Sequence, residues 1–120
     1  MAKDNIILQK SFDFAVHIID LYRQLVKEKE FIISKQVFRS GTSIGANVEE
    51  AIAGQSKKDF IHKMNIVLKE AKETHYWLRL FDKTRLVSID YSKSLSLADE
   101  LIKILSSIIK TAKVNSLPNS

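Results

Sequence analysis

The chain has 120 residues, a formal net charge of +5, three glycines, one proline and no cysteine. So few turn-forming residues argue against sandwiches, barrels and other many-stranded folds, and the missing cysteines exclude disulfide bonds and cysteine-ligated metals. This length, with an apolar share of 45%, is typical of a single globular domain.

The first predicted helix spans about residues 5–27 and carries two apolar rows at helical spacing. The first row consists of Leu8, Phe12, Ala15, Ile19, Tyr22 and Val26. The second row consists of Ile7, Phe14, Ile18, Leu21 and Leu25. One row is enough to face a bundle core, so we expect the other to contact a further copy of the chain, with a broad core as the alternative. The spacing does not decide which row faces outward.

The second predicted helix spans about residues 31–53 and follows a polar break at residues 27–30. Its inner face is expected to hold Ile33, Val37, Ile44, Val48 and Ala51. Gly41 and Gly45 lie on one face, and each costs about 1 kcal/mol relative to alanine inside a helix. Close approach of a neighbouring helix backbone would offset this cost, and a kink is the alternative explanation.

A polar ridge follows the same helix at spacings of four, four and three residues. It consists of Arg39, Ser43, Asn47 and Glu50. We interpret this ridge as a hydrogen-bonded and ion-paired seam that fixes the register of two helices. A ligand-binding role is the alternative interpretation.

The third predicted helix spans residues 57–84 and begins at a pair that resembles a capping box, Ser56 and Asp59. Gly54 is placed to end the helix before it. The core row of the third helix is expected to contain Phe60, Met64, Val67, Ala71, Thr74, Leu78 and Phe81.

The fourth predicted helix spans about residues 90–114, with Ser88 or Asp90 as its cap, and residues 115–120 are expected to form a frayed tail. It also carries two apolar rows, one of Leu95, Ala98, Ile102, Leu105, Ile109 and Ala112, the other of Leu97, Leu101, Ile104 and Ile108. The pattern predicts an all-α, antiparallel up-down-up-down four-helix bundle as one domain over residues 1–120. The surplus rows of the first and fourth helices predict self-association.

A stripe of basic and aromatic residues lies on the third helix, away from its core row. The candidate nucleic-acid-binding residues on it are Lys58, His62, Lys69, Lys72, Tyr76, Arg79 and Lys83. Its five cations, with no carboxylate among them, would neutralise successive phosphates, and Tyr76 offers a stacking face. The alternative is a solvated face whose lysines pair with Asp59, Glu70 and Glu73.

Three segments carry a resemblance to a known family: residues 39–51 (RSGTSIGANVEEA), residues 54–60 and residues 69–80. Across about residues 5–113, the chain resembles the bacterial four-helix-bundle proteins encoded in intervening sequences of 23S rRNA genes. Members of that family resemble in turn the pentameric accessory protein of diversity-generating retroelements, which binds nucleic acid and a reverse transcriptase. The resemblance implies a bundle, homopentamers and a role around RNA, and it does not imply a place in the ribosome.

No phosphate-binding loop, nucleophile elbow or dinucleotide fingerprint occurs, so we expect neither an enzyme nor a cofactor. Asp13, His17 and Asp20 share a face of the first helix, but Lys10 on the same face marks it as the solvent side, so no metal site is expected. Without a signal peptide or an apolar run near ~18 residues, the protein is expected in the cytoplasm and not in a membrane.

The expected partners are further copies of the chain and structured RNA or DNA bound by the stripe. The alternative is an assembly or adaptor protein whose partner is another protein and whose basicity is incidental. Nothing in the sequence identifies a particular RNA or biological process.

Overall fold

The computed structural model of the chain describes residues 2–115. It contains four helices: α1 (Ala2–Lys27), α2 (Ile33–Ile52), α3 (Lys57–Thr84) and α4 (Ser92–Asn115). The described residues contain no strand, which confirms the all-α prediction. The predicted tail lies outside the described residues except for Asn115, which is the last residue of α4.

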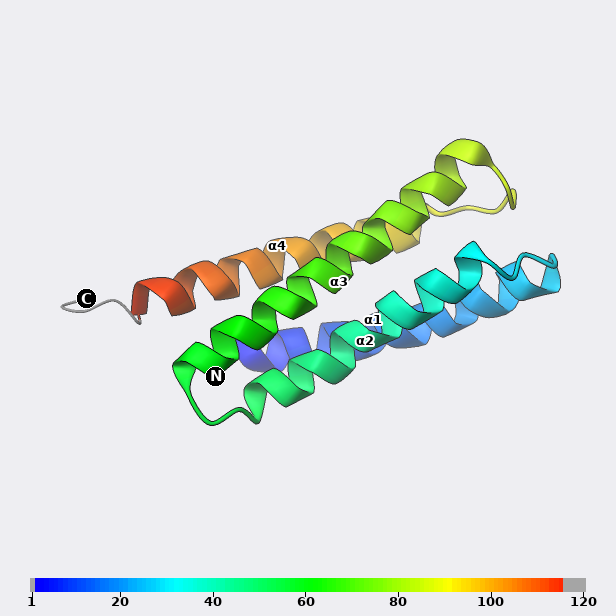
Figure 1. Cartoon of the computed structure of the whole chain (residues 1–120). Helices are drawn as coiled ribbons and strands as arrows, with labels where there is room; N and C mark the ends of the chain where they lie inside the picture. The colour runs from blue at the N-terminus through cyan, green and yellow to red at the C-terminus, as the bar shows by residue number, and fades with distance from the viewer. Residues whose placement is uncertain (1, 116–120) are drawn as a thin grey trace.

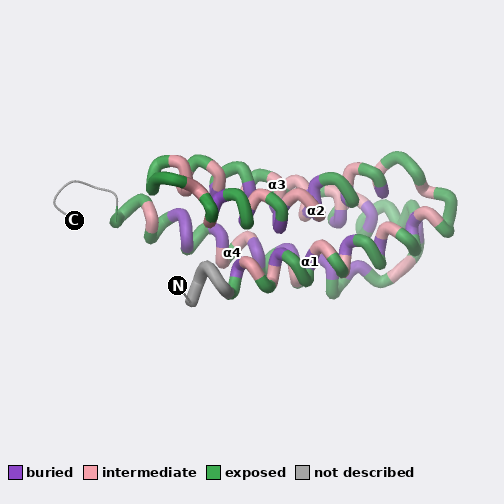
Figure 2. The backbone as a smooth tube through the Cα atoms, turned by 90° about the horizontal axis from the view of Figure 1, so that it is seen from below, coloured by how far each residue is buried: buried purple, intermediate pink, exposed green. Residues whose placement is uncertain are grey.

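The helices form an elongated bundle of 54 × 23 × 22 Å in which successive helices run in opposite directions (Figure 1). Each helix packs on its two neighbours in the order α1, α2, α3, α4, and α4 closes the ring against α1. Helices α1 and α3 are therefore diagonal to each other, and so are α2 and α4. Figure 2 shows that buried segments recur along the sides of the helices that face one another. None of the helices, over the residues described, has an apolar stretch long enough to cross a membrane.

The predicted inner faces of α2 and α3 are the buried ones, apart from half-buried residues at their first turns. On α1 the structure selects the second apolar row, whose five residues are at most 3% exposed. The first row is the outer one: Phe12 is 59% and Ile19 36% exposed, and its other four residues are half-buried. The orientation that the spacing left open is thus resolved.

On α4, the two apolar rows share the inner side of the helix. The buried apolar residues, Ala98, Leu101, Leu105, Ile108 and Ile109, come from both rows. Leu95, Leu97, Ile102 and Ile104 are half-buried and pack against this core. Neither row of the fourth helix faces outward as a whole, so the surplus apolar row expected there packs on the bundle core.

Both helical glycines lie where α1 approaches α2. A Cβ atom on Gly45 would stand 3.2 Å from the backbone oxygen of Ser11, and one on Gly41 would stand 2.8 Å from Cγ1 of Ile18. Neither glycine has a positive φ. The two glycines therefore allow another helix to approach closely, as predicted. They are not required for an unusual backbone conformation.

The helix starts differ from expectation by two residues in α2 and α4 because side chains bond the chain just before each helix. Asp90 Oδ1 accepts from the backbone N–H of Ser92 at 2.9 Å, so α4 begins at Ser92. The Glu30 carboxylate accepts from the N–H groups of Ile32, Ile33 and Ser34 at 3.0, 3.2 and 2.6 Å. For α3, Ser56 Oγ accepts from the Asp59 N–H at 3.1 Å, as the capping pair predicts.

Glu30 gives the fold a pH-dependent cap. Partial burial raises the pKa of its carboxyl, but the hydrogen bonds from Ser34, Ile32 and Ile33 outweigh that effect and hold the pKa below its ordinary value of 4.5. A depressed pKa contributes stability above the ordinary value, and this stability is lost as the pH falls through the folded-state pKa.

We expect Glu30→Gln to lower the free energy of unfolding by about 1 kcal/mol near pH 7, the usual worth of a helix cap. The difference from the unmodified protein should shrink at a pH well below 4.5, as the pH falls through the lowered pKa of the native carboxyl. Urea unfolding followed by circular dichroism at both pH values measures this. An equal difference at both would show that the charge of Glu30 does not contribute.

Candidate nucleic-acid interface

The seven residues predicted to bind nucleic acid, called the basic stripe below, all lie on the outer surface of α3. They are Lys58, His62, Lys69, Lys72, Tyr76, Arg79 and Lys83, and each is exposed. Together with the exposed Asn65, they follow one another at alternating spacings of four and three residues, opposite the buried row of α3. At 1.5 Å per residue, this row is about 38 Å long.

The acidic residues beside the stripe are turned towards α2. Arg39 Nη1 lies 3.4 Å from Glu70 Oε2, and Arg39 Nη2 pairs with Glu73 Oε2. Ser43 Oγ donates to Glu70 Oε2 at 3.1 Å, and the Trp77 indole N–H donates to Glu73 Oε2 at 3.0 Å. Both carboxylates are thus held by groups outside the stripe.

The stripe's cations have no acidic partner of their own. Across residues 2–115, no ion pair involves Lys58, Lys69, Lys72, Arg79 or Lys83. The arrangement differs from the alternative in which Asp59, Glu70 and Glu73 pair with lysines of the stripe, because Glu70 and Glu73 pair with Arg39 and Asp59 makes no ion pair in the described chain. The positive charge of this face is therefore available to an external anion.

The predicted polar ridge of α2 reaches α3 through only two of its four members. Arg39 and Ser43 make the contacts to Glu70 and Glu73 described above. Asn47 is half-buried and Glu50 exposed, and no side-chain hydrogen bond or ion pair joins either of them to another described residue. A buried hydrogen bond from Thr74 Oγ1 to Ser40 Oγ, at 2.8 Å, adds a further link between α2 and α3.

The ring of Tyr76, the one Phe, Tyr or Trp residue of the stripe, already has two neighbours. Tyr76 is 46% exposed, and the guanidinium carbon of Arg79 lies 5.8 Å from its ring centroid. The ring of Trp77 meets it edge-on, with 5.2 Å between the centroids. Trp77 itself is half-buried and packs against the core.

Two of the three histidines link helices. His75 Nε2 lies 3.0 Å from Asp99 Oδ1 and joins α3 to α4. His17 Nε2 lies 2.6 Å from Ser94 Oγ, so His17 itself is half-buried against α4, whereas Asp13 and Asp20 on the same face are exposed, as a solvent face predicts. Burial, and then the nearby charge of Lys93, lower the pKa of His17 against the opposing effect of Asp20. Within residues 2–115, no three His, Asp or Glu side chains are grouped as a metal site.

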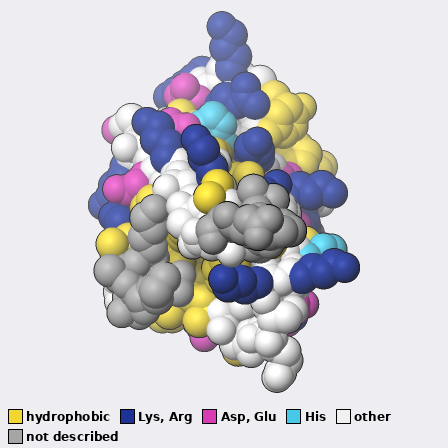
Figure 3. Space-filling model, turned by 90° about the vertical axis from the view of Figure 1, so that its left-hand side faces the viewer, with side chains coloured by type: hydrophobic (Ala, Val, Ile, Leu, Met, Phe, Trp, Pro, Cys, Tyr) yellow, Lys and Arg dark blue, Asp and Glu magenta, His cyan; other side chains and the backbone are white. Residues whose placement is uncertain are grey.

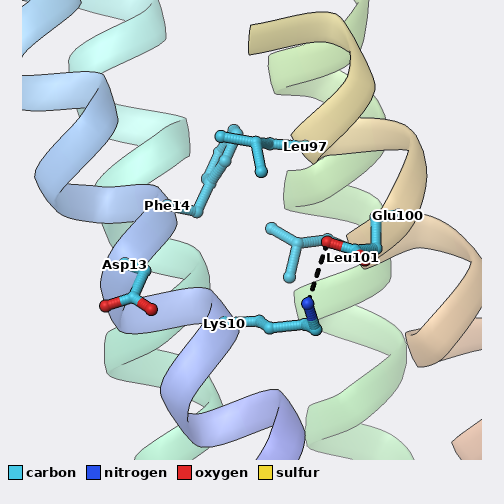
Figure 4. Close-up of a pocket in the computed structure, with 6 residues that line it drawn as sticks. All are labelled: Lys10, Asp13, Phe14, Leu97, Glu100 and Leu101. Carbon is cyan, nitrogen blue, oxygen red and sulfur yellow. Dashed lines mark ion pairs between the residues drawn. The ribbon is translucent and has the colours of Figure 1, made fainter. Parts of the chain in front are cut away.

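A small cleft lies between α1 and α4 (Figure 4). It is lined by Lys10, Asp13, Phe14, Leu97, Glu100 and Leu101, and Lys10 Nζ pairs with Glu100 Oε1 at 3.1 Å across it. Its volume is about 90 Å³. Pockets that hold small molecules usually measure about 300–1,000 Å³, so this cleft is too small for such a ligand.

A second exposed feature, called the apolar strip below, lies on the outer side of α1 beside α2. It consists of Phe12, Val16 and Ile19 of α1, with exposed fractions of 59%, 48% and 36%, and Phe38 of α2, with 38%. The ring of Phe38 contacts that of Tyr22, with centroids 4.7 Å apart, so α1 and α2 form one continuous surface here. Because α1 is diagonal to α3, a partner on the apolar strip would leave the basic stripe uncovered.

Positive charge is not confined to the basic stripe. Figure 3 shows the molecule from one end, with Lys and Arg side chains on several sides and an apolar area at one edge. Helix α4 also carries exposed lysines, among them Lys103 and Lys110. Any test of the stripe therefore has to separate its position from the overall charge.

The sequence and the fold both match known proteins. The family model described as 23S rRNA-intervening sequence protein matches residues 3–107. The chain is also similar to a crystal structure from Bacteroides thetaiotaomicron, of a protein with unknown function from the S23 ribosomal protein family, with 52% identity and a TM-score of 0.86. That similarity covers 90% of this chain and 98% of the other. No curated protein matches the chain.

Proposed function

The chain belongs to the 23S rRNA-intervening sequence protein family, and from this premise we propose that it is a non-enzymatic, oligomeric protein that binds nucleic acid through the basic stripe of α3. The observation that carries the proposal is the row of five exposed cations without acidic partners. The resemblance of the family to a nucleic-acid-binding accessory protein supports it. The site of action is the cytoplasm, and no cofactor takes part.

Binding of this kind draws its free energy from counterion release. Each lysine or arginine that neutralises a phosphate frees a condensed cation from the nucleic acid, so affinity falls steeply as salt is added. The stripe holds charged side chains on flexible stems and few groups suited to reading base edges. We therefore expect weak dependence on base sequence.

The experiment is a titration of fluorescently labelled structured RNA with the pure protein, followed by anisotropy at several salt concentrations. If one subunit engages all five cations, raising the salt from about 50 to about 200 mM should weaken binding by about 10²–10³-fold. No binding at the low salt concentration would contradict the proposal, and the adaptor function would take its place.

Oligomers would repeat the stripe and strengthen binding through multivalency. The apolar strip is the surface proposed for self-association, because its four large side chains are exposed, three of them share one face of α1, and Phe38 contacts α1 at Tyr22. Five copies is the number suggested by the resemblance to the retroelement accessory proteins. Burying these side chains would remove apolar area from water on each subunit.

We expect light scattering at micromolar concentration to give a mass several times the 13.7 kDa of one chain. Phe12→Asp should shift the protein towards the monomer, because a carboxylate would have to be buried in the interface. Phe31→Asp is the matched control: Phe31 is also 59% exposed but lies in the loop between α1 and α2. A monomeric unmodified protein, or equal effects of the two variants, would contradict this assignment.

A further inference from the structure

The basic stripe has a shape as well as a charge, and its shape distinguishes between two forms of nucleic acid. Resting on the function proposed above, we infer that the ligand of the stripe is double-helical nucleic acid and not a flexible single strand. Three observations carry the inference: the stripe is an outward ridge, it lies on one continuous helix, and Tyr76, its one Phe, Tyr or Trp ring, already contacts Arg79 and Trp77.

The ridge lacks what single-strand binding surfaces have. Such surfaces combine a positively charged groove with aromatic side chains on which successive bases stack. The basic stripe lies on the side of α3 opposite the core, so it is convex. Tyr76 is its only Phe, Tyr or Trp residue.

The ring of Tyr76 is poorly placed to stack on a base. The guanidinium of Arg79 lies over it at 5.8 Å, and the edge of Trp77 meets it at 5.2 Å. A flexible strand would lose conformational freedom along the whole row and gain little stacking in return. The convex ridge therefore favours a ligand that is already ordered.

A double helix supplies that order together with a dense row of phosphates. Its charge density is about one phosphate per 1.7 Å of axis when both strands are counted. The stripe, about 38 Å long, is comparable to one turn of the duplex, which is about 34–36 Å. Because the stripe is held on one continuous helix, its cations meet the duplex without a rearrangement of the protein.

The stripe also has little capacity to read bases. Lysine is a mobile point charge, and the amide nitrogen of Asn65 donates to the backbone oxygen of Ile61 at 3.0 Å. Recognition should therefore depend on duplex geometry and phosphate positions.

The test compares four labelled probes with equal numbers of phosphates: RNA and DNA duplexes of about 20 base pairs, and oligo-U and oligo-dT of about 40 nucleotides. At one low salt concentration, we expect at least one duplex to bind about tenfold or more tightly than either single strand. The difference in affinity between the RNA and DNA duplexes identifies which of the two double helices the stripe binds.

The variant Tyr76→Ala provides the second measurement, and it should weaken single-strand binding no more than duplex binding, because no base stacks on the ring. Equal or tighter binding of the single strands would overturn the inference but not the proposed function. A loss of about tenfold in single-strand binding on Tyr76→Ala, with single strands preferred, would identify the ring as a stacking platform. No binding of any probe would overturn both the inference and the proposed function.

Discussion

Reversing Lys69, Lys72 and Lys83 to glutamate is expected to abolish measurable binding of nucleic acid at low salt. The three residues are exposed and have no acidic partners in the described chain, so their loss breaks no ion pair. Each reversal removes one phosphate contact and adds a repelling charge. Compared with the unmodified protein, we expect a loss of about 10³-fold or more in anisotropy titrations at about 50 mM salt.

The matched control reverses Lys103, Lys110 and Lys113, which are the exposed lysines of α4 beyond its first turns. Either triple variant takes the formal net charge from +5 to −1. A general loss of positive charge would affect both variants, whereas a specific interface on α3 predicts a much weaker effect for the control. Far-ultraviolet circular dichroism should show the same helix content in all three proteins. Equal losses in the two variants would mean that the stripe is only a solvated face.

The sequence alone predicts the position of the basic stripe because helical geometry decides it. Residues spaced by three and four must share a face, and the core row of α3 leaves only the opposite face for the charges. The helical spacing does not predict whether those charges have acidic partners. It depends on Arg39, which lies in α2 and holds Glu70 and Glu73.

This contact requires the register between α2 and α3, which the apolar pattern of either helix alone does not define. A signal for it was present in the sequence. In an antiparallel pair with a short connection, the residue numbers of facing positions have a nearly constant sum, and such pairing would bring Arg39 near Glu70. The spacing of the ridge within α2 does not identify its acceptors, and only the pairing of α2 with α3 points to Glu70 and Glu73.

The outward row of α1 could not be predicted for a related reason. Both rows are apolar and have the same period, so the helices that pack against α1 determine which row is buried. In the structure, Gly41 meets the side chain of Ile18 and Gly45 meets the backbone of Ser11. The glycine face of α2 therefore brings the side of α1 that carries Ile18 into the core and leaves Phe12 outside.

If that explanation holds, Gly45→Leu should destabilise the fold strongly. A Cβ atom at this position would lie 3.2 Å from the backbone oxygen of Ser11 and 3.6 Å from the backbone nitrogen of Phe12. Backbone cannot rotate away as a side chain can, so the rest of a leucine would force α1 and α2 apart. We expect the free energy of unfolding to fall by about 3 kcal/mol or more, measured by urea unfolding.

Two variants separate this contact from the general effects of a larger residue. Ala46→Leu adds a side chain to the next position of α2, which is exposed, and should change the stability by less than about 0.5 kcal/mol. Gly45→Ala should lie within about 1 kcal/mol of the unmodified protein, because the higher helix propensity of alanine offsets one tight contact. If Gly45→Leu were as mild as Ala46→Leu, the two helices would tolerate separation. The close approach at Gly45 would then not be what selects the buried face of α1.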